Sequence, residues 1–204
     1  MSDLHLRPEG RSTDRILLKA LELFSERGYD ATSVREICEA AGVTKPTLYH
    51  FYGSKEGVYR AIVEGALERF RADMIGALVS EGPLRTRLVR MARGYVDATL
   101  REPDLARFIM ALIHNPPRSA PSTDFVGFYE SILSELARAI ESAAARSEIA
   151  AGPTDVRLLI FMGALGEAMH GYLLVGRPEL TPQLAETLVD TVLRGWSVPL
   201  RTPA

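Results

Sequence analysis

The sequence predicts an all-α protein, and three observations support this fold class. Apolar residues recur at three- and four-residue spacing along most of the 204 residues, which is the period of an amphipathic helix. Glycine and proline separate these segments, as at Gly82-Pro83 and Gly152-Pro153. No run alternates β-branched and polar residues as a half-buried strand would. We therefore expect helices joined by loops along the chain.

The first helix is expected over residues 13–27. Ile16 and Phe24 fall on its apolar face, and Gly28 can end it. Residues 1–10 lack this pattern and are expected to form a flexible N-terminal arm. The chain thus opens with a short tail and one amphipathic helix.

A capping box predicts the start of the second helix. Ser33 is followed three residues later by Glu36. The Ser33 hydroxyl can therefore accept a hydrogen bond from the Glu36 amide while the Glu36 carboxylate accepts one from the Ser33 amide. Ile37, Ala40 and Ala41 follow at helical spacing and are expected to face inward.

An elbow and a third short helix come next. Gly42-Val43-Thr44 joins a glycine that can end a helix to a threonine that can cap the following one. That helix is expected over 45–52, with Leu48 and one of Phe51 or Tyr52 inward. Its outer surface then carries Lys45, Pro46, Thr47, Tyr49 and His50. A cation, a hydroxyl and hydrogen-bonding aromatic rings suit a helix laid in the major groove of DNA.

The same stretch resembles a known family. The run Thr47-Leu48-Tyr49-His50-Phe51-Tyr52-Gly53-Ser54-Lys55-Glu56-Gly57, with Gly42-Val43-Thr44 before it, is similar to the signature of the TetR family of transcriptional regulators. The resemblance covers residues 13–62, and beyond them only the helical architecture is similar. It implies a helix-turn-helix DNA-binding domain over 11–58 and a helical effector-binding and dimerisation domain over 59–204.

The resemblance also implies partners and contacts. The expected partners are double-stranded operator DNA, a second copy of the chain and a small-molecule effector, with repression as the expected mode. The predicted base contacts are Arg35, Lys45, Pro46 and Tyr49. The predicted phosphate contacts are Thr44, Thr47, His50 and Lys55, and Ser33 lies on the same surface. Phe51-Tyr52 departs from the family pattern, so no phosphate contact is assigned to Phe51 and the role of Tyr52 stays open.

The remaining sequence predicts further helices. Ser54 is expected to cap a long fourth helix, whose buried side includes Val58 and Ile62 and which Gly76 and Gly82-Pro83 bring to its end. Three prolines within 115–122 predict a loop. Helices are expected over 84–100, 104–114, 123–146, 154–175 and 182–196.

The last two helices are the predicted dimer surface. Residues 158–166 are apolar nearly all round, so more than one side must be covered. Small residues such as Gly163 allow a second helix to approach closely. The following helix has a stripe of its own at Leu184, Leu188, Val192 and Trp196. Two helices from each subunit would form a twofold four-helix interface, although the stripe could instead belong to the core of one protomer.

An effector pocket is expected among aromatic and sulfur-containing residues of the C-terminal domain. The candidates are Phe108, His114, Phe128, Tyr129, Met162, Met169 and His170. An apolar pocket with a few polar groups is the usual form of such a site. The same residues at helical spacing also suit a plain core.

Charge offers no general support for DNA binding. Residues 1–55 contain eight Lys/Arg against eight Asp/Glu, so attraction to DNA must come from the placement of charges. Arg7 and Arg11 are candidates for phosphate contacts, although a solvated tail is the favoured interpretation. The alternative function is therefore a helical small-molecule carrier or adaptor that does not bind DNA.

Other classes find little support in the sequence. Glu167-x-x-His170 has the spacing of a di-iron bundle but lacks a second such pair, and no nucleotide-binding or hydrolase motif occurs. We predict no enzyme activity, metal or cofactor. The lone Cys38 is expected to be a packed thiol rather than a redox sensor, and fits a cytoplasmic protein. No signal peptide or membrane-length apolar stretch is expected.

Overall fold

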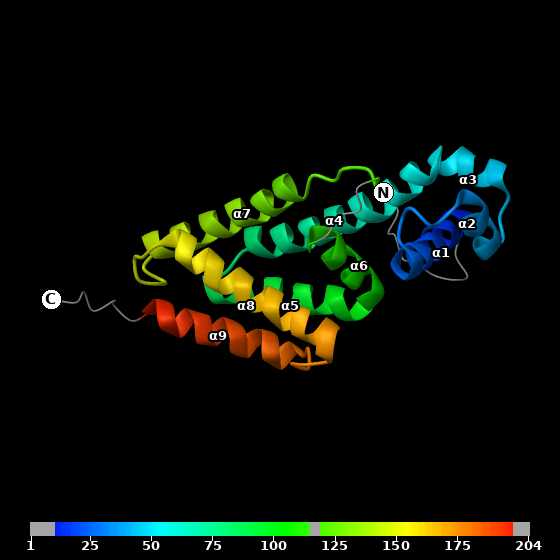
Figure 1. Ribbon diagram of the computed structural model, residues 1–204. Helices are drawn as coiled ribbons and strands as arrows, with labels where there is room; N and C mark the ends of the chain where they lie inside the picture. Colours follow the sequence, from blue (N-terminus) through cyan, green and yellow to red (C-terminus); the bar gives the residue numbers. More distant parts are fainter. Residues whose placement is uncertain (1–10, 115–118, 198–204) are drawn as a thin grey trace. The chain divides into compact units, whose positions relative to one another are not determined.

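Nine α-helices make up the regular secondary structure of the residues described by the computed structural model, 11–114 and 119–197, apart from the side chains of His114 and Ser197 (Figure 1). The helices are α1 (Ser12–Arg27), α2 (Val34–Ala41), α3 (Lys45–Tyr52), α4 (Lys55–Val79), α5 (Leu84–Arg101), α6 (Pro103–His114), α7 (Phe125–Ala145), α8 (Thr154–Val175) and α9 (Pro182–Ser197). The predicted all-α fold is confirmed.

One predicted helix boundary was wrong. Gly76 does not help to end α4, which continues to Val79. A glycine lacks only a side chain and keeps its backbone N–H, so a helix can pass through it at a cost of about 1 kcal/mol. The chain turns instead at Gly82, whose φ of 118° is open to glycine but not to most other residues. Of the predicted loop, residues 115–118 lie outside the described part of the chain.

The chain forms two compact units. The first, here the head unit, comprises Met1–Arg69 and Asp104–Phe125, and the second, here the core unit, comprises Phe70–Pro103 and Val126–Ala204. Helix α4 contributes its N-terminal part to the head unit and its C-terminal part to the core unit. The functional division at residue 58 remains a prediction, because compactness alone does not show which residues bind DNA or an effector.

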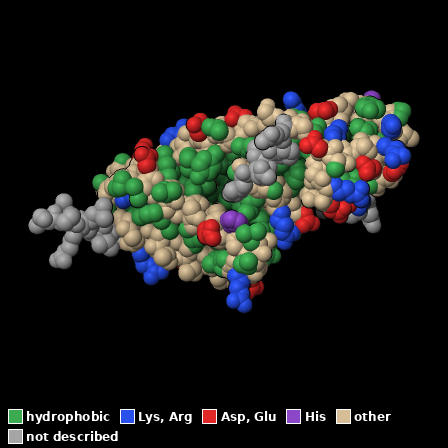
Figure 2. Space-filling model, viewed as in Figure 1, with side chains coloured by type: hydrophobic (Ala, Val, Ile, Leu, Met, Phe, Trp, Pro, Cys, Tyr) green, Lys and Arg blue, Asp and Glu red, His purple; other side chains and the backbone are tan. Residues whose placement is uncertain are grey.

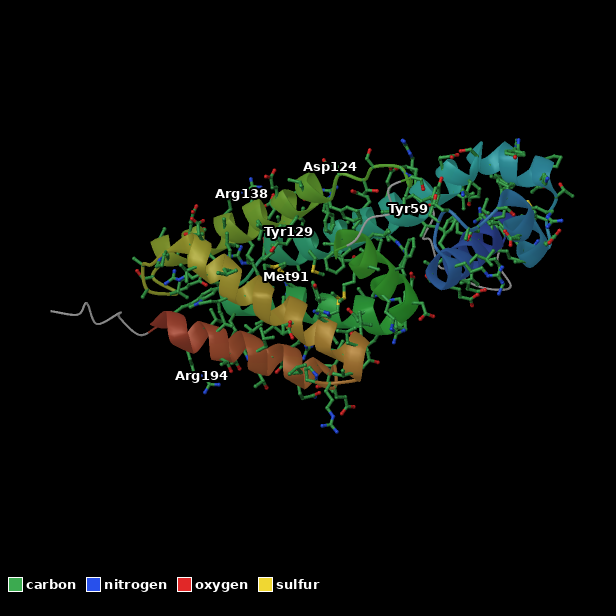
Figure 3. All side chains as sticks on the ribbon, in the orientation of Figure 1. Tyr59, Met91, Asp124, Tyr129, Arg138 and Arg194 are labelled. Atoms are coloured by element: carbon green, nitrogen blue, oxygen red, sulfur yellow. The ribbon has the colours of Figure 1, made fainter. Side chains whose placement is uncertain are left out.

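An aromatic cluster lies inside the head unit. The Tyr29 ring packs against Phe24 with centroids 5.4 Å apart and against Tyr59 at 5.0 Å, and Tyr59 in turn meets Phe108 at 6.2 Å (Tyr59 is labelled in Figure 3). Tilted and edge-on contacts of this kind are favourable for aromatic rings. Burial, with a smaller contribution from the Glu56 carboxylate, raises the pKa of Tyr29 to about 12. The cluster joins α1, α4 and α6 within this unit.

The core unit is built around the packing of α5 against α9. Leu88, Met91, Phe161 and Val189 are fully buried in it, and the Arg85 guanidinium forms a two-pronged ion pair with Asp190 across the α5–α9 contact, at 2.6 and 3.0 Å. A bidentate pair of this geometry fixes orientation as well as distance. The Asp190 hydrogen bond and charge raise the pKa of Arg85.

The apolar stripe of α9 belongs to this core rather than to the outside. Val192 and Trp196 are buried, and Leu184 and Leu188 pack against the same cluster. Arg157 lies over the Trp196 ring, 5.3 Å from its centroid. The core of one protomer thus covers Val192 and Trp196 fully but Leu184 and Leu188 only in part. The dimer surface expected on the last two helices therefore stays a prediction.

Helix α8 keeps an uncovered apolar side. Within the described residues it is the one helix long and apolar enough to cross a membrane by length and composition, and only 17% of that stretch is buried. We expected no apolar stretch of this length, but beyond Glu167, which ends the run 158–166, mainly apolar residues resume and continue to Val175. One such helix is weak evidence for a membrane span, since a helix that packs against a partner has the same composition. Figure 2 shows hydrophobic side chains gathered over α7 and α8 on the face in view.

Candidate nucleic-acid interface

The start of α2 is fixed by the predicted capping box. The Glu36 N–H donates to Ser33 Oγ at 3.3 Å, and the Ser33 N–H donates to Glu36 Oε2 at 2.8 Å. Arg27 Nη1 lies 3.3 Å from Glu36 Oε1. These bonds satisfy amides that a helix leaves free at its N-terminus and give α2 a defined first turn.

The inner face of α2 differs from the prediction at one position. Ile37 and Ala41 are buried as expected, but Ala40 is exposed and Cys38 takes the inward place. On a helix of 3.6 residues per turn, Ala41 lies between Ile37 and Cys38, whereas Ala40 lies on the opposite side of Ile37. Cys38 is thus a packed thiol, as predicted, and burial raises its pKa.

The elbow between α2 and α3 has the two predicted features, a left-handed glycine and a threonine cap. Gly42 has the left-handed conformation (φ 62°, ψ 40°), and Thr44 Oγ1 accepts from the Thr47 N–H at 3.4 Å. Leu48, on the inner side of α3, is completely buried. The Arg15 side chain of α1 donates to the Ala41 carbonyl at 3.2 Å, which ties down the end of α2. The local structure is a capped helix-turn-helix.

The predicted DNA-contacting residues lie on the outer side of this motif. Arg35, Thr44, Lys45, Pro46, Tyr49, His50 and Ser33 are exposed, and Thr47 is half-buried. The Tyr49 ring is 48% exposed, so it is accessible to an external partner. The Arg35 guanidinium lies 3.8 Å from Glu39 one turn away and is free to move, because both side chains are well exposed. The placement suits DNA contacts, which remain predictions.

Phe51 and Tyr52, between which the sequence did not decide, divide into an outer and an inner residue. Phe51 is 49% exposed and meets the His50 ring edge-on at 5.0 Å. The Tyr52 hydroxyl donates to the Thr13 carbonyl at 3.1 Å, and burial raises its pKa to about 12. Tyr52 is therefore a structural link between α3 and α1. Phe51 is an outer residue that the sequence prediction left without a role.

Lys55 lies at the start of α4 and has contacts that the sequence did not predict. Its Nζ donates to the Tyr29 carbonyl at 2.9 Å and to the Thr32 carbonyl at 3.0 Å, and lies 4.2 Å from the centroid of the Tyr29 ring. Two of its three N–H donors are thus engaged inside the head unit. The phosphate contact predicted for Lys55 remains untested.

We expect the capping box to make the stability of the head unit sensitive to acid. Hydrogen bonds from the Ser33 side chain and backbone lower the pKa of Glu36 in the folded protein. A lowered folded-state pKa stabilises the fold above the ordinary glutamate range, and this stabilisation is lost as the pH falls through the lowered value. The difference in unfolding free energy between wild type and Glu36→Gln should therefore shrink as the pH falls from the ordinary glutamate range through the lowered pKa of Glu36.

Urea denaturation at a series of pH values measures this difference. Glu39→Gln is the matched control, because Glu39 is on the same helix but outside the capping box. A Glu36→Gln difference that stays constant as the pH falls would show that the carboxylate charge does not contribute through the cap.

The residues predicted for an effector pocket are divided between the two units, and their role stays a prediction. Phe108 belongs to the head-unit aromatic cluster, Phe128 packs on Phe70, and the Tyr129 ring on α7 is half-exposed (Figure 3). Met162 packs against the core and the His170 imidazole lies 3.9 Å from Glu167. Met169 lines an apolar pocket of about 10 Å³, which has room for at most one water molecule. The His114 side chain lies outside the described residues.

A metal centre is not formed by the described residues, which contain no group of three potential ligands. The Glu167–His170 pair accordingly stands alone as a spacing match to the di-iron motif. Charged residues of both signs are interspersed over α1 to α3 on the face shown in Figure 2. This distribution agrees with the balanced charge of the N-terminal sequence.

Comparison with known proteins connects this geometry to one family. Residues 16–62 match the model of the family described as bacterial regulatory proteins, tetR family. The chain is similar to the HTH-type transcriptional repressor ComR of Escherichia coli K12, 42% identical over 66 residues that are 32% of this chain and 31% of ComR. It is also similar to the negative transcriptional regulator IcaR of Staphylococcus epidermidis, 40% identical over 57 residues that are 28% of this chain and 31% of IcaR. The matches thus span about a third of the length of these relatives.

Solved structures extend the likeness to the whole fold. The regulator PfmR from Thermus thermophilus superposes with a TM-score of 0.71 at 22% identity, over 93% of this chain and 100% of that one. The fatty acid degradation regulator FadR from Bacillus halodurans gives 0.66 at 18% identity, over 96% and 99%. At such identities the likeness shows the fold alone. The sequence similarity itself is concentrated in the helices that present Lys45 and Tyr49.

Proposed function

The chain belongs to the TetR family of bacterial regulatory proteins through its N-terminal helices, and we propose that it is a ligand-responsive transcriptional repressor that binds DNA as a homodimer. The observation that carries the proposal is the outer surface of α3. Lys45, Tyr49 and His50 are exposed there on a helix that a capped elbow and a buried Leu48 hold in place. Relatives that share this segment are regulators rather than enzymes, and we place the protein in the bacterial cytoplasm, where its DNA is.

In the proposed complex, α3 lies in the major groove. Lys45 and Arg35 approach base edges, and Pro46 and Tyr49 provide apolar contact to thymine methyl groups. Thr44, Thr47 and His50 contact phosphates beside the groove. Because the head unit carries no excess of positive charge, these few contacts must supply most of the attraction to DNA, and weak general affinity is expected.

The proposed dimer surface is the uncovered side of α8. Val156, Leu159, Ile160, Gly163 and Leu174 are exposed at helical spacing, and a soluble protein seldom leaves such an apolar stripe in water. A second copy related by a twofold axis would cover it with the same stripe. The two heads would then be separated by one turn of DNA (~34–36 Å) or a multiple of it, and the operator would be nearly palindromic.

The effector is proposed to act through α4. This helix begins directly after α3 and ends in the core unit, so a ligand that shifts its C-terminal part would also move the DNA-reading helices. The apolar pocket beside Met169 is nearly closed, and effector entry would require it to open. If a saturating effector left operator affinity unchanged, this mechanism would be contradicted.

The test is DNA binding by wild type and by the Lys45→Ala/Tyr49→Ala variant, measured by fluorescence anisotropy with DNA from upstream of the protein's own gene. We expect the variant to lose about 1–3 kcal/mol of binding free energy, which is roughly 10- to 100-fold in affinity. The logarithm of the wild-type binding constant should fall with log[salt] at a slope of about −0.9 per phosphate contacted. Lys19→Ala is the matched control, since Lys19 on α1 pairs with Glu22 at 2.8 Å outside the predicted surface.

The alternative of a carrier or adaptor makes the opposite prediction. Balanced charge in the head favours it, and such a protein would bind none of the DNA offered and show no salt slope. Equal binding by wild type and the double variant would instead mean that residues other than Lys45 and Tyr49 contact the bases.

A further inference from the structure

We infer that Lys55 is a positioning residue: its ammonium fastens the first turn of α4 to the link between α1 and α2, and thereby sets the orientation in which α3 is presented. The inference rests on the proposed DNA binding. It gives Lys55 a role inside the protein, in place of the phosphate contact that the family resemblance suggested.

The acceptors of Lys55 are themselves fixed. They are the carbonyls of Tyr29 and Thr32, in the link between α1 and α2. The Thr32 hydroxyl, 2% exposed as a residue, is within hydrogen-bond distance of the Gly28 and Leu23 carbonyls at 2.9 and 3.3 Å. The ammonium therefore binds an ordered turn rather than a mobile loop. The charge on Lys55 strengthens both bonds relative to neutral ones.

The same turn of α4 holds Tyr29 a second time. Tyr59 lies four residues after Lys55, so the two side chains share one face of α4. The Lys55 Nζ lies over the Tyr29 ring, 4.2 Å from its centroid. The Tyr59 ring packs edge-on against the same Tyr29 ring, with the two centroids 5.0 Å apart. Cation–π and aromatic contacts of this kind add to the two hydrogen bonds. Tyr29 is thereby held from two positions on α4.

This fastening leads directly to α2. Thr32, which accepts from Lys55, is followed by Ser33, the capping residue of α2. At the other end of the motif, α3 is joined to α4 by Gly53 and Ser54, and Ser54 Oγ accepts from the Gly57 N–H at 3.1 Å. Helix α4 is therefore connected to both ends of the helix-turn-helix. The chain itself joins α4 to the end of α3, and the Lys55 hydrogen bonds join α4 to the turn before α2. Loss of the ammonium would leave the chain connection and the contact of the Tyr59 ring with Tyr29, but no hydrogen bond from Lys55 to the turn before α2.

The test compares wild type with Lys55→Met, which keeps much of the aliphatic stem and removes the charge. Lys19→Met is the control for loss of a positive charge in the same unit. Operator binding is measured by anisotropy over a series of salt concentrations, and amide hydrogen exchange of residues 28–36 is measured without DNA.

For Lys55→Met we expect operator affinity to fall about tenfold with an unchanged salt slope, because no phosphate contact is lost. We also expect faster exchange across 28–36 in the absence of DNA, because the turn is no longer fastened. Lys19→Met should exchange as wild type does in this segment.

Three results would overturn the inference. A salt slope reduced by about 0.9 would identify a direct phosphate contact, unchanged affinity would show that the fastening has no effect on DNA binding, and unchanged exchange would show that the turn does not depend on Lys55. If wild type binds no operator, the proposed function fails, and the exchange measurement alone decides whether Lys55 holds the turn.

Discussion

Replacing Gly57 by alanine is expected to lower the free energy of unfolding by about 1–3 kcal/mol, the usual cost of forcing an extra atom into a packed site, and to weaken operator binding at least tenfold. A Cβ at this position would lie 1.8 Å from the carbonyl oxygen of Tyr52. That oxygen belongs to the backbone at the end of α3 and cannot rotate aside. The α3–α4 junction must therefore open, which displaces the DNA-reading helix.

Gly76→Ala is the matched control on the same helix. A Cβ there meets nothing within 4 Å, so the substitution should raise stability by up to about 1 kcal/mol, through the higher helix propensity of alanine. Urea denaturation and operator anisotropy measure both variants. Equal stability for Gly57→Ala and wild type would contradict this prediction, because it would mean that the α3–α4 junction can accommodate a Cβ beside the Tyr52 carbonyl.

Leu159→Glu is expected to convert the dimer to a monomer and to reduce operator affinity on the order of 100-fold, because two linked heads bind far more tightly than one. Leu159 is 73% exposed and belongs to the uncovered stripe on α8. A glutamate there costs a free protomer little, but in a twofold interface it would bury two unpaired carboxylates.

Sedimentation equilibrium gives the oligomeric state, and anisotropy gives the affinity. Leu100→Glu is the control, because Leu100 is an exposed leucine on α5 and not part of the α8 stripe. A Leu159→Glu protein that remains dimeric would place the interface elsewhere, and a monomeric wild type would contradict the proposed homodimer.

Local features of the sequence predicted the helices and much of the candidate interface. Helix caps and the left-handed glycine interact only with residues a few positions away in the chain. The positions of Ser33, Glu36, Gly42 and Thr44 alone therefore locate α2 and α3. The outer residues of α3 then follow from the helical period and the buried Leu48. No information from distant parts of the chain is needed for these steps.

Features that depend on distant residues could not be predicted in this way. The partners of Lys55 are backbone carbonyls 23 and 26 residues earlier, and carbonyls carry no sequence signal. Phe51 and Tyr52 are adjacent aromatic residues, and the acceptor of the inward Tyr52 hydroxyl is the Thr13 carbonyl, 39 residues earlier in the chain.

Periodicity also could not say which partner covers an apolar face. The stripes of α8 and α9 look alike in sequence, yet the α9 stripe packs in large part against its own protomer and much of the α8 stripe does not. An effector pocket raises the same difficulty, because its lining and an ordinary core use the same residues. Tertiary packing decides between them.

The position of Trp196 offers a way to observe the two units separately. It is the single tryptophan of the chain and is buried in the core unit beside Arg157. Its fluorescence emission therefore reports melting around α8 and α9, whereas far-ultraviolet circular dichroism reports helices throughout the molecule. If the two signals change at different denaturant concentrations, the protein does not unfold in one cooperative step, and the early loss of circular dichroism would mark the opening of the helices around Tyr29.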